Sequence, residues 1–176
     1  KIDALLAQPL ATDHIMRVTT KWEGHRGSDT AEFHVAVYDF GIKENILQSL
    51  ENEGCKLTIF PANTKAETVM DCKPDGIFLS NGPGDPKDVP EIVEEIKKLV
   101  GQKPIFGICM GHQLIARAFG GETYKLRFGH RGSNHPVKDL DTNRVYITSQ
   151  NHGYAVDEAS LEGSGLRVSH RSVNDG

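Results

Sequence analysis

The feature that most constrains the fold is a regular alternation of short apolar runs with amphipathic segments, which begins at Phe33. Residues 35–38 and 57–60 are four-residue apolar runs of the length typical of buried strands. Between them, apolar residues from Ile42 to Leu50 recur at helical spacing, and Gly54 ends that segment. Strands separated by helices in this way pair in parallel, because each helix carries the chain back across the sheet.

The same alternation continues along the chain. Apolar runs predict further strands at residues 76–79, 104–108, 145–148 and 166–169, and apolar spacing predicts helices at residues 64–70 and 92–100 and in the segment that carries Leu114 and Phe119. The chain is therefore expected to have an α/β fold, with a mostly parallel central sheet flanked by helices on both faces.

Two parts of the chain differ in regularity. Residues 1–32 have scattered charges and no sustained period, so they are predicted to be a connector or tail from an upstream domain. Residues 33–176 are predicted to form one domain, because the length is ordinary for a single domain.

Composition narrows the class of partner and compartment. The formal net charge of -4 leaves no basic excess to neutralise phosphates, which disfavours nucleic acid and anionic membranes as partners. Neither a long apolar span nor a signal-peptide pattern is visible in the sequence. Cys55, Cys72 and Cys109 are odd in number and lack metal-ligand spacing, so no metal site is expected. Free thiols indicate a reducing compartment, so the protein is expected to be cytoplasmic, or to lie in the matrix of an organelle.

Residues 107–113 (Gly-Ile-Cys-Met-Gly-His-Gln) carry the strongest chemical signal. Cys109 stands between two glycines, after a predicted strand and before a predicted helix, as in a nucleophile elbow with Cys in place of Ser. Small neighbours permit the sharp turn, and the N–H groups of a helix amino terminus favour a thiolate. The alternatives are a buried structural cysteine and a metal site with His112, which no second ligand pair completes.

Two polar loops are expected at the same edge of the sheet, where ligands bind in folds of this class. Residues 80–86 (Ser-Asn-Gly-Pro-Gly-Asp-Pro) could present a backbone N–H as an oxyanion hole, or could be a plain turn. Residues 149–154 (Ser-Gln-Asn-His-Gly-Tyr) could bind a polar ligand. There His152 is a base partner for Cys109, a binding group or a structural residue, and spacing does not decide between these roles.

These motifs resemble those of a known family. Residues 107–113 resemble the nucleophile signature of class I, triad-type glutamine amidotransferases, and residues 80–85 resemble their oxyanion loop. Residues 38–46, 128–137 and 150–156 are similar to the glutamine-hydrolysing small subunits of carbamoyl-phosphate synthetases within that family. Residues 128–137 and 150–156 argue, by that resemblance, against the members that serve anthranilate, aminodeoxychorismate or GMP synthesis.

The resemblance implies an activity and a set of roles. Cys109 would attack the carboxamide of glutamine and form a glutamyl thioester, while the backbone N–H groups of Gly82 and Met110 hold the oxyanion. Ammonia would pass to a large synthetase subunit, which is expected to hold ATP, bicarbonate and metal, so that no cofactor is expected on this chain. The residues implied in glutamine binding, His152 now among them, are Gly84, Gln113, Asn151, His152, Gly153 and Tyr154.

The sequence departs from the family pattern in one respect. In the family, the base histidine and its orienting glutamate lie in a His-Pro-Glu segment, whereas His135-Pro136 is followed here by Val137. We therefore expect a chain that is truncated within the domain and that alone is a poor glutaminase. The alternative is a non-catalytic, degenerate module that binds glutamine or a partner chain. His112 and His130 are interpreted as structural residues.

Overall fold

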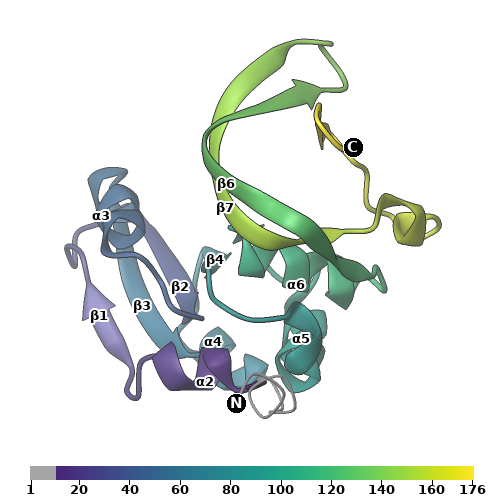
Figure 1. Ribbon diagram of the computed structural model, residues 1–176. Coiled ribbons are helices and arrows are strands. Elements are labelled where there is room, and N and C mark those ends of the chain that lie inside the picture. The colour runs from purple at the N-terminus through teal and green to yellow at the C-terminus, as the bar shows by residue number, and fades with distance from the viewer. Residues whose placement is uncertain (1–10) are drawn as a thin grey trace, which may run out of the picture.

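The computed structural model describes residues 11–176 and is built around a five-stranded sheet in the order β1-β3-β2-β4-β5. Four of these strands run parallel, and β1 pairs antiparallel with β3 at one edge (Figure 1). The predicted α/β class with a mostly parallel sheet is therefore confirmed. The strands are β1 (Gly24–Arg26), β2 (Phe33–Asp39), β3 (Cys55–Pro61), β4 (Gly76–Leu79) and β5 (Ile105–Gly107).

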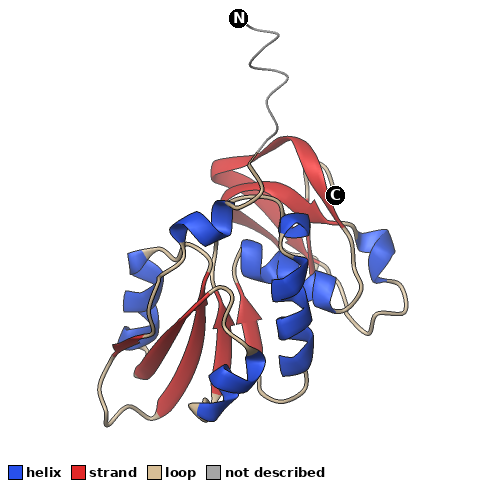
Figure 2. Ribbon diagram, turned by 90° about the horizontal axis from the view of Figure 1, so that it is seen from below, coloured by secondary structure: helices blue, strands red, loops and turns tan. Residues whose placement is uncertain are grey.

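Helices cover both faces of this sheet (Figure 2). One face packs against α3, and the other packs against α4, α5 and α6. Within residues 11–176, no helix combines the length and the apolar character that a membrane crossing requires. The helices of this layer are α3 (Glu44–Asn52), α4 (Ala66–Asp71), α5 (Pro90–Leu99) and α6 (Met110–Ala118).

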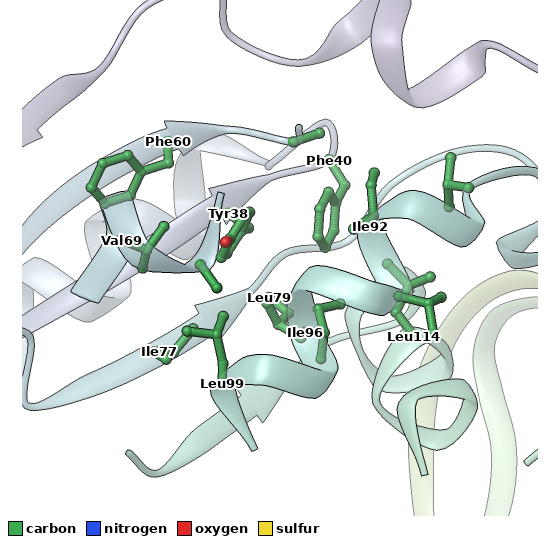
Figure 3. Packing of buried hydrophobic residues seen from close by; sticks show 14 of the residues in the cluster. Tyr38, Phe40, Phe60, Val69, Ile77, Leu79, Ile92, Ile96, Leu99 and Leu114 are labelled. Carbon is green, nitrogen blue, oxygen red and sulfur yellow. The ribbon is translucent and has the colours of Figure 1, made fainter. Parts of the chain in front are cut away.

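The two faces of β2 explain how one strand supports both layers. Successive side chains of a strand point to opposite faces, so Val37 packs with Leu47 of α3 while Tyr38 packs on the other side. Figure 3 shows that second cluster, in which Tyr38 lies among residues such as Leu79 and Ile96. Leu79 and Ile96 are fully buried, and burying such a side chain contributes roughly 1.5–3 kcal/mol to the stability of the folded state.

A separate three-stranded antiparallel sheet, in the order β7-β6-β8, follows α6. Figure 1 shows β6 and β7 as a long curved ribbon, with the C-terminal segment on its concave side. The strand predicted at residues 145–148 is the start of β7, but it belongs to this antiparallel sheet. Its strands are β6 (Thr123–Asp139), β7 (Val145–Val156) and β8 (His170–Ser172), and two short 3-10 helices lie at Pro86–Asp88 and Glu158–Leu161.

The strand predicted at residues 166–169 is wrong in position. The strand lies at His170–Ser172, where His170 pairs with Asp139 of β6. Pairing begins only where the amide of Leu140 donates to the carbonyl oxygen of Ser169, at 2.8 Å. The register is thus set by the partner strand β6, which the apolar run at residues 166–169 does not reveal.

Residues 14–26 pack onto the five-stranded sheet, although the sequence suggested a connector or tail. Helix α2 (His14–Val18) buries Ile15 to 2 % exposure, and β1 pairs with β3. The amide of Thr20 donates to Asp39 Oδ2 at 2.7 Å, at the carboxyl end of β2. This segment is held by one buried apolar residue, Ile15, and by the backbone pairing of β1 with β3. Neither requires a periodic pattern of apolar residues, which is why the sequence did not indicate it. Residues 1–10 lie outside the described residues.

Candidate active site

Cys109 occupies a sharp turn between β5 and α6. Its φ of 53° and ψ of -105° lie in a region that a side chain adopts only under strain, which is a frequent property of functional residues. A Cβ atom on Gly111 would lie 2.1 Å from the carbonyl oxygen of Leu79, and one on Gly107 would lie 2.5 Å from the carbonyl carbon of Gly111. The two glycines are therefore required for the strand, elbow and helix to meet, as expected from the sequence.

The loop that starts at Ser80 is clamped to the turn after β2. Ser80 Oγ accepts from the amide of Phe40 at 2.9 Å, and Asn81 Nδ2 donates to the carbonyl oxygen of Gly41 at 2.9 Å. Gly82 approaches Phe40 so closely that a Cβ atom there would lie 2.4 Å from the Phe40 carbonyl oxygen. The position of the Gly82 backbone is thereby fixed by its neighbours.

Asp39 organises the turn on which that loop rests, a role that the sequence analysis missed. Its side chain is only 7 % exposed, and its Oδ1 accepts from the amides of Gly41 and Ile42, both at 2.8 Å. Its Oδ2 accepts from the amide of Thr20. An Asp-x-Gly sequence at the end of a buried strand is a signal for such a side-chain-capped turn.

Strand β7 approaches the elbow through two contacts. Gln113 Nε2 of α6 donates to the carbonyl oxygen of Tyr154 at 2.7 Å. The thiol of Cys109 lies 4.0 Å from the carbonyl oxygen of Asn151, and this is its one hydrogen-bond contact in the described part of the chain. A carbonyl oxygen accepts but cannot take a proton as a base does, so this contact orients the thiol without activating it.

All nine residues predicted for the site line one open cavity of about 1180 Å³. The structure thus brings together three segments that are far apart in the sequence, while the chemical roles of the residues stay predictions. Residues 166–172 and Asp175, which the sequence analysis did not include, complete the wall. Across residues 11–176 no cluster of three metal-ligating side chains is present. The nine are Gly82, Gly84, Cys109, Met110, Gln113, Asn151, His152, Gly153 and Tyr154.

Histidines give the cavity its titratable character. Burial lowers the pKa of His112, and the neighbouring His152 lowers it further. Burial also lowers the pKa of His152, although its bond to the carbonyl oxygen of Tyr154 acts in the opposite direction. Both rings therefore favour the neutral form. His130, interpreted as structural from the sequence, lies in the same wall and contacts His152 directly.

The other two cysteines lie elsewhere. Cys55 and Cys72 pack against the two hydrophobic clusters of the five-stranded sheet, and burial raises the pKa of both thiols. A raised pKa keeps them in the less reactive thiol form. Cys109 is thus the cysteine that combines a strained backbone with access to the cavity.

Comparison with known proteins identifies the class. A family model of class I glutamine amidotransferases matches residues 36–176, and the chain belongs to this family. The sequence is 51% identical over 170 residues to a carbamoyl phosphate synthase small chain of Clostridium acetobutylicum, covering 97% of this chain and 48% of that protein. It is 54% identical over 175 residues to the corresponding chain of Pasteurella multocida, covering 97% and 45%. The resemblance inferred from the motifs is confirmed.

The curated relatives are longer than this chain, so each match covers only part of the relative. A chloroplastic carbamoyl phosphate synthase small chain of Oryza sativa subsp. japonica is 54% identical over 159 residues, which are 90% of this chain and 35% of that protein. The chain spans about half the length, or less, of these curated relatives.

Solved structures support the fold alone. A putative GMP synthase protein from Thermoplasma acidophilum matches with a TM-score of 0.66 at 20% identity, over 80% of this chain and 73% of that one. A glutamine amidotransferase from Thermotoga maritima matches with a TM-score of 0.55 at 15% identity, over 71% and 62%.

Proposed function

We propose that this chain is the glutamine-hydrolysing part of a carbamoyl-phosphate synthetase, with Cys109 as its nucleophile. The observation that carries the proposal is the strained elbow that presents the Cys109 thiol to a cavity bounded by the Gly82 loop and the Asn151 segment. The identity to carbamoyl phosphate synthase small chains over most of the chain supports this choice over other members of the family.

The first half of the reaction forms a thioester. Cys109 Sγ attacks the side-chain carboxamide carbon of glutamine, and the carbonyl electrons move onto oxygen. The N–H groups of Gly82 and Met110 stabilise that oxyanion, and losing one such donor costs on the order of 10²–10³ in rate at comparable sites. When the oxyanion collapses, the C–N bond breaks, and the nitrogen takes up the thiol proton and leaves as ammonia.

The second half releases glutamate. Water adds to the thioester carbonyl, the C–S bond breaks, and a proton returns to the sulfur of Cys109. By the family resemblance, a histidine of a His-Pro-Glu segment moves these protons, and the 176 residues contain no such segment. Its place is therefore proposed to lie in the longer protein that the relatives represent.

Binding of glutamine is assigned to the cavity wall that α6 and β7 share. The amide nitrogen of Gln113 is already engaged by the carbonyl oxygen of Tyr154, which leaves Gln113 Oε1 as the group that can accept from an N–H donor of the substrate. The polar segment from Asn151 to Tyr154 and the backbone at Gly84 line the remainder of the site.

The product defines the partner. Ammonia released at Cys109 is proposed to pass to a large synthetase subunit, which would hold ATP, bicarbonate and metal. In this arrangement, glutamine hydrolysis supplies nitrogen to a ligase reaction elsewhere, and the present chain needs no cofactor of its own.

The test measures ammonia and glutamate released from L-glutamine by the natural gene product and by two variants. Cys109→Ser is expected to abolish the release of ammonia and glutamate while L-glutamine still binds. Cys72→Ser is expected to release both products as the unchanged protein does. Binding of L-glutamine without release of ammonia by the unchanged protein would instead favour the non-catalytic module. That alternative draws on the absence, among the described residues, of a histidine hydrogen-bonded to Cys109.

A further inference from the structure

The charged side chains that line the cavity have an excess of positive charge. Four cationic side chains and two carboxylates lie in its wall, whereas the whole chain carries a net charge of -4. Free glutamine carries an ionised α-carboxylate at neutral pH, so this excess favours the carboxylate end of the proposed substrate. The cations are Lys43, Arg131, Arg167 and Arg171, and the carboxylates are Glu158 and Asp175.

Two of the three arginines in this wall already have partners. Arg167 pairs with Asp141, and Arg171 pairs with Glu158. Arg131 forms no ion pair with a carboxylate among residues 11–176, and its one hydrogen bond there runs from Nη1 to the carbonyl oxygen of Phe128, at 2.7 Å. A guanidinium has five N–H donors, so most of those of Arg131 remain available to a ligand.

The pairing of β6 with β7 places Arg131 beside the wall proposed for glutamine. Arg131 lies opposite Asn151, whose carbonyl oxygen is 4.0 Å from the Cys109 thiol. Arg131 Nη2 lies 3.6 Å from the position that a Cβ atom on Gly153 would occupy. The guanidinium therefore lies next to Gly153, in the part of β7 that approaches the elbow.

Gly129 leaves the space that the guanidinium occupies. Its φ is 70°, and a Cβ atom there would overlap Arg131 Nη1 and would lie 2.8 Å from the carbonyl oxygen of His152. A side chain at this position would therefore be strained and would displace the guanidinium from β7. Figure 1 shows the curved ribbon of β6 and β7 to which these residues belong.

We propose that Arg131 is a specificity-determining residue, whose guanidinium binds the α-carboxylate of glutamine. The planar fork of an arginine matches a carboxylate through two parallel N–H···O bonds, which fix orientation as well as adding affinity. With the carboxylate held by Arg131 and the carboxamide at Cys109, the substrate is bound at both ends. This inference rests on the proposed function, and it names the group that recognises the amino-acid end of the substrate.

Lys43 is the alternative that the experiment has to separate. It lines the same cavity and has no carboxylate partner among the described residues. Its backbone amide donates to Asn81 Oδ1 at 3.2 Å, so Lys43 belongs to the wall formed by the Gly82 loop and not to β6. Its ammonium is a point charge on a flexible stem and offers no fork to a carboxylate.

Equilibrium binding to the Cys109→Ser form of the natural gene product tests the inference without turnover. Isothermal titration compares L-glutamine with L-glutaminamide, in which a neutral carboxamide replaces the α-carboxylate. We expect L-glutamine to bind about 10–100-fold more tightly, because hydrogen bonds between two charged groups are lost in the amide. With Arg131→Gln added, L-glutamine is expected to bind as weakly as L-glutaminamide, whose own affinity changes little. Continued binding of L-glutaminamide shows that the variant is folded.

Two further substitutions separate a direct contact from a general effect of charge. Arg131→Lys keeps the charge but loses the fork, so it is expected to retain part of the preference for L-glutamine. Arg127→Gln is the matched control, because it removes an equal charge from the same strand. Arg127 lies over the ring of Phe128, 5.2 Å from its centre, and is not among the residues that line the cavity. It is expected to leave the preference unchanged.

The outcomes distinguish the two proposals. If Arg131→Gln keeps the preference for L-glutamine, or if Lys43→Gln abolishes it, the role of Arg131 is overturned while the proposed function stands. Equal affinities for the two ligands before Arg131 is changed would overturn that role as well. If the unchanged protein neither binds L-glutamine nor releases ammonia from it, the proposed function fails, and this inference fails with it.

Discussion

The side-chain amide of Gln113 donates to the carbonyl oxygen of Tyr154 at 2.7 Å, and it thereby ties the helix that follows Cys109 to the second sheet. Gln113 is nearly fully buried, on the first turns of α6, and Tyr154 lies near the end of β7. This bond sets how the Asn151 segment faces Cys109, so that the cavity depends on the relation between two sheets.

Removing this tie is expected to loosen the site more than the fold. Gln113→Leu keeps the volume but loses the donor, while the carbonyl oxygen of Tyr154 retains its bond to His152 Nδ1. We expect a loss of about 1 kcal/mol in the free energy of unfolding and a higher KM for glutamine. Urea unfolding measures the loss of stability, and initial rates at several glutamine concentrations measure KM. Gln48→Leu, at an exposed position of α3, is the control. Equal effects of the two substitutions would contradict the assigned role.

The elbow is expected to reject even one methyl group. In Gly111→Ala, the new Cβ atom would lie 2.1 Å from the backbone oxygen of Leu79, so the backbone of β4 or α6 has to move. We expect a loss of about 3 kcal/mol or more in the free energy of unfolding, measured by denaturant titration. Gly24→Ala is the control, because its nearest neighbour would be the side chain of Ile59 at 3.9 Å. A stable Gly111→Ala protein would show that the elbow is less tightly packed than described.

Asp39 is expected to act on catalysis at a distance. Asp39→Ala leaves the amides of Thr20, Gly41 and Ile42 without their acceptor, so the turn that supports the Gly82 loop loosens. If the Gly82 amide is the oxyanion donor proposed above, we expect kcat for glutamine hydrolysis to fall by about tenfold or more, because a displaced donor stabilises the transition state less well. Asp39→Asn, which keeps one accepting oxygen, is expected to fall between Asp39→Ala and the unchanged protein. A normal kcat in Asp39→Ala would contradict this link.

Glu95 is expected to make stability depend on acid pH. The amide of Ala66, at 2.9 Å, together with Lys65 and Lys98, lowers the pKa of Glu95 from 4.5 to about 2 despite the cost of burial. Because the folded pKa is the lower one, the stabilisation is fully present above the unfolded value near 4.5 and is lost as pH falls through about 2.

The measurement compares unfolding free energies at pH 7 and pH 2.5. Glu95→Gln is expected to cost roughly 1–3 kcal/mol at pH 7 and less at pH 2.5. Glu94→Gln, which removes an exposed partner of Lys97, is expected to change stability little at either pH. A pH-independent cost of Glu95→Gln would mean that the charge of Glu95 is not what stabilises the protein.

The parallel strands β2, β3 and β4 were predictable because each is a short apolar run whose residues are mostly buried, while β5 at the sheet edge leaves Phe106 exposed. Strand β6 was not, since its 17 residues are mostly polar, include Gly129, Gly132 and Pro136, and only two of them are buried. Its pairing partners are residues of β7 and β8, so tertiary contacts and not local composition hold it in the extended form.

Some features of the candidate site were likewise predictable from the sequence, and others were not. Cys109 and the Gly82 loop were predictable because glycine spacing records local backbone constraints. The contact of His130 with Asp175 joins residues 45 positions apart and leaves no spacing in the sequence. Asp39 was visible as a strand end, but its three amide donors become apparent only when the turn is folded.

Selective alkylation tests most directly whether Cys109 is the nucleophile of a glutamine site. The native protein is treated with a chloroketone analogue of L-glutamine, and the extent of labelling at each cysteine is measured by peptide mass spectrometry. We predict that Cys109 is labelled first and that L-glutamine protects it. Cys55 and Cys72, whose pKa is raised by burial, are expected to react only after unfolding. Equal labelling of all three cysteines in the native protein, without protection by L-glutamine, would contradict that assignment.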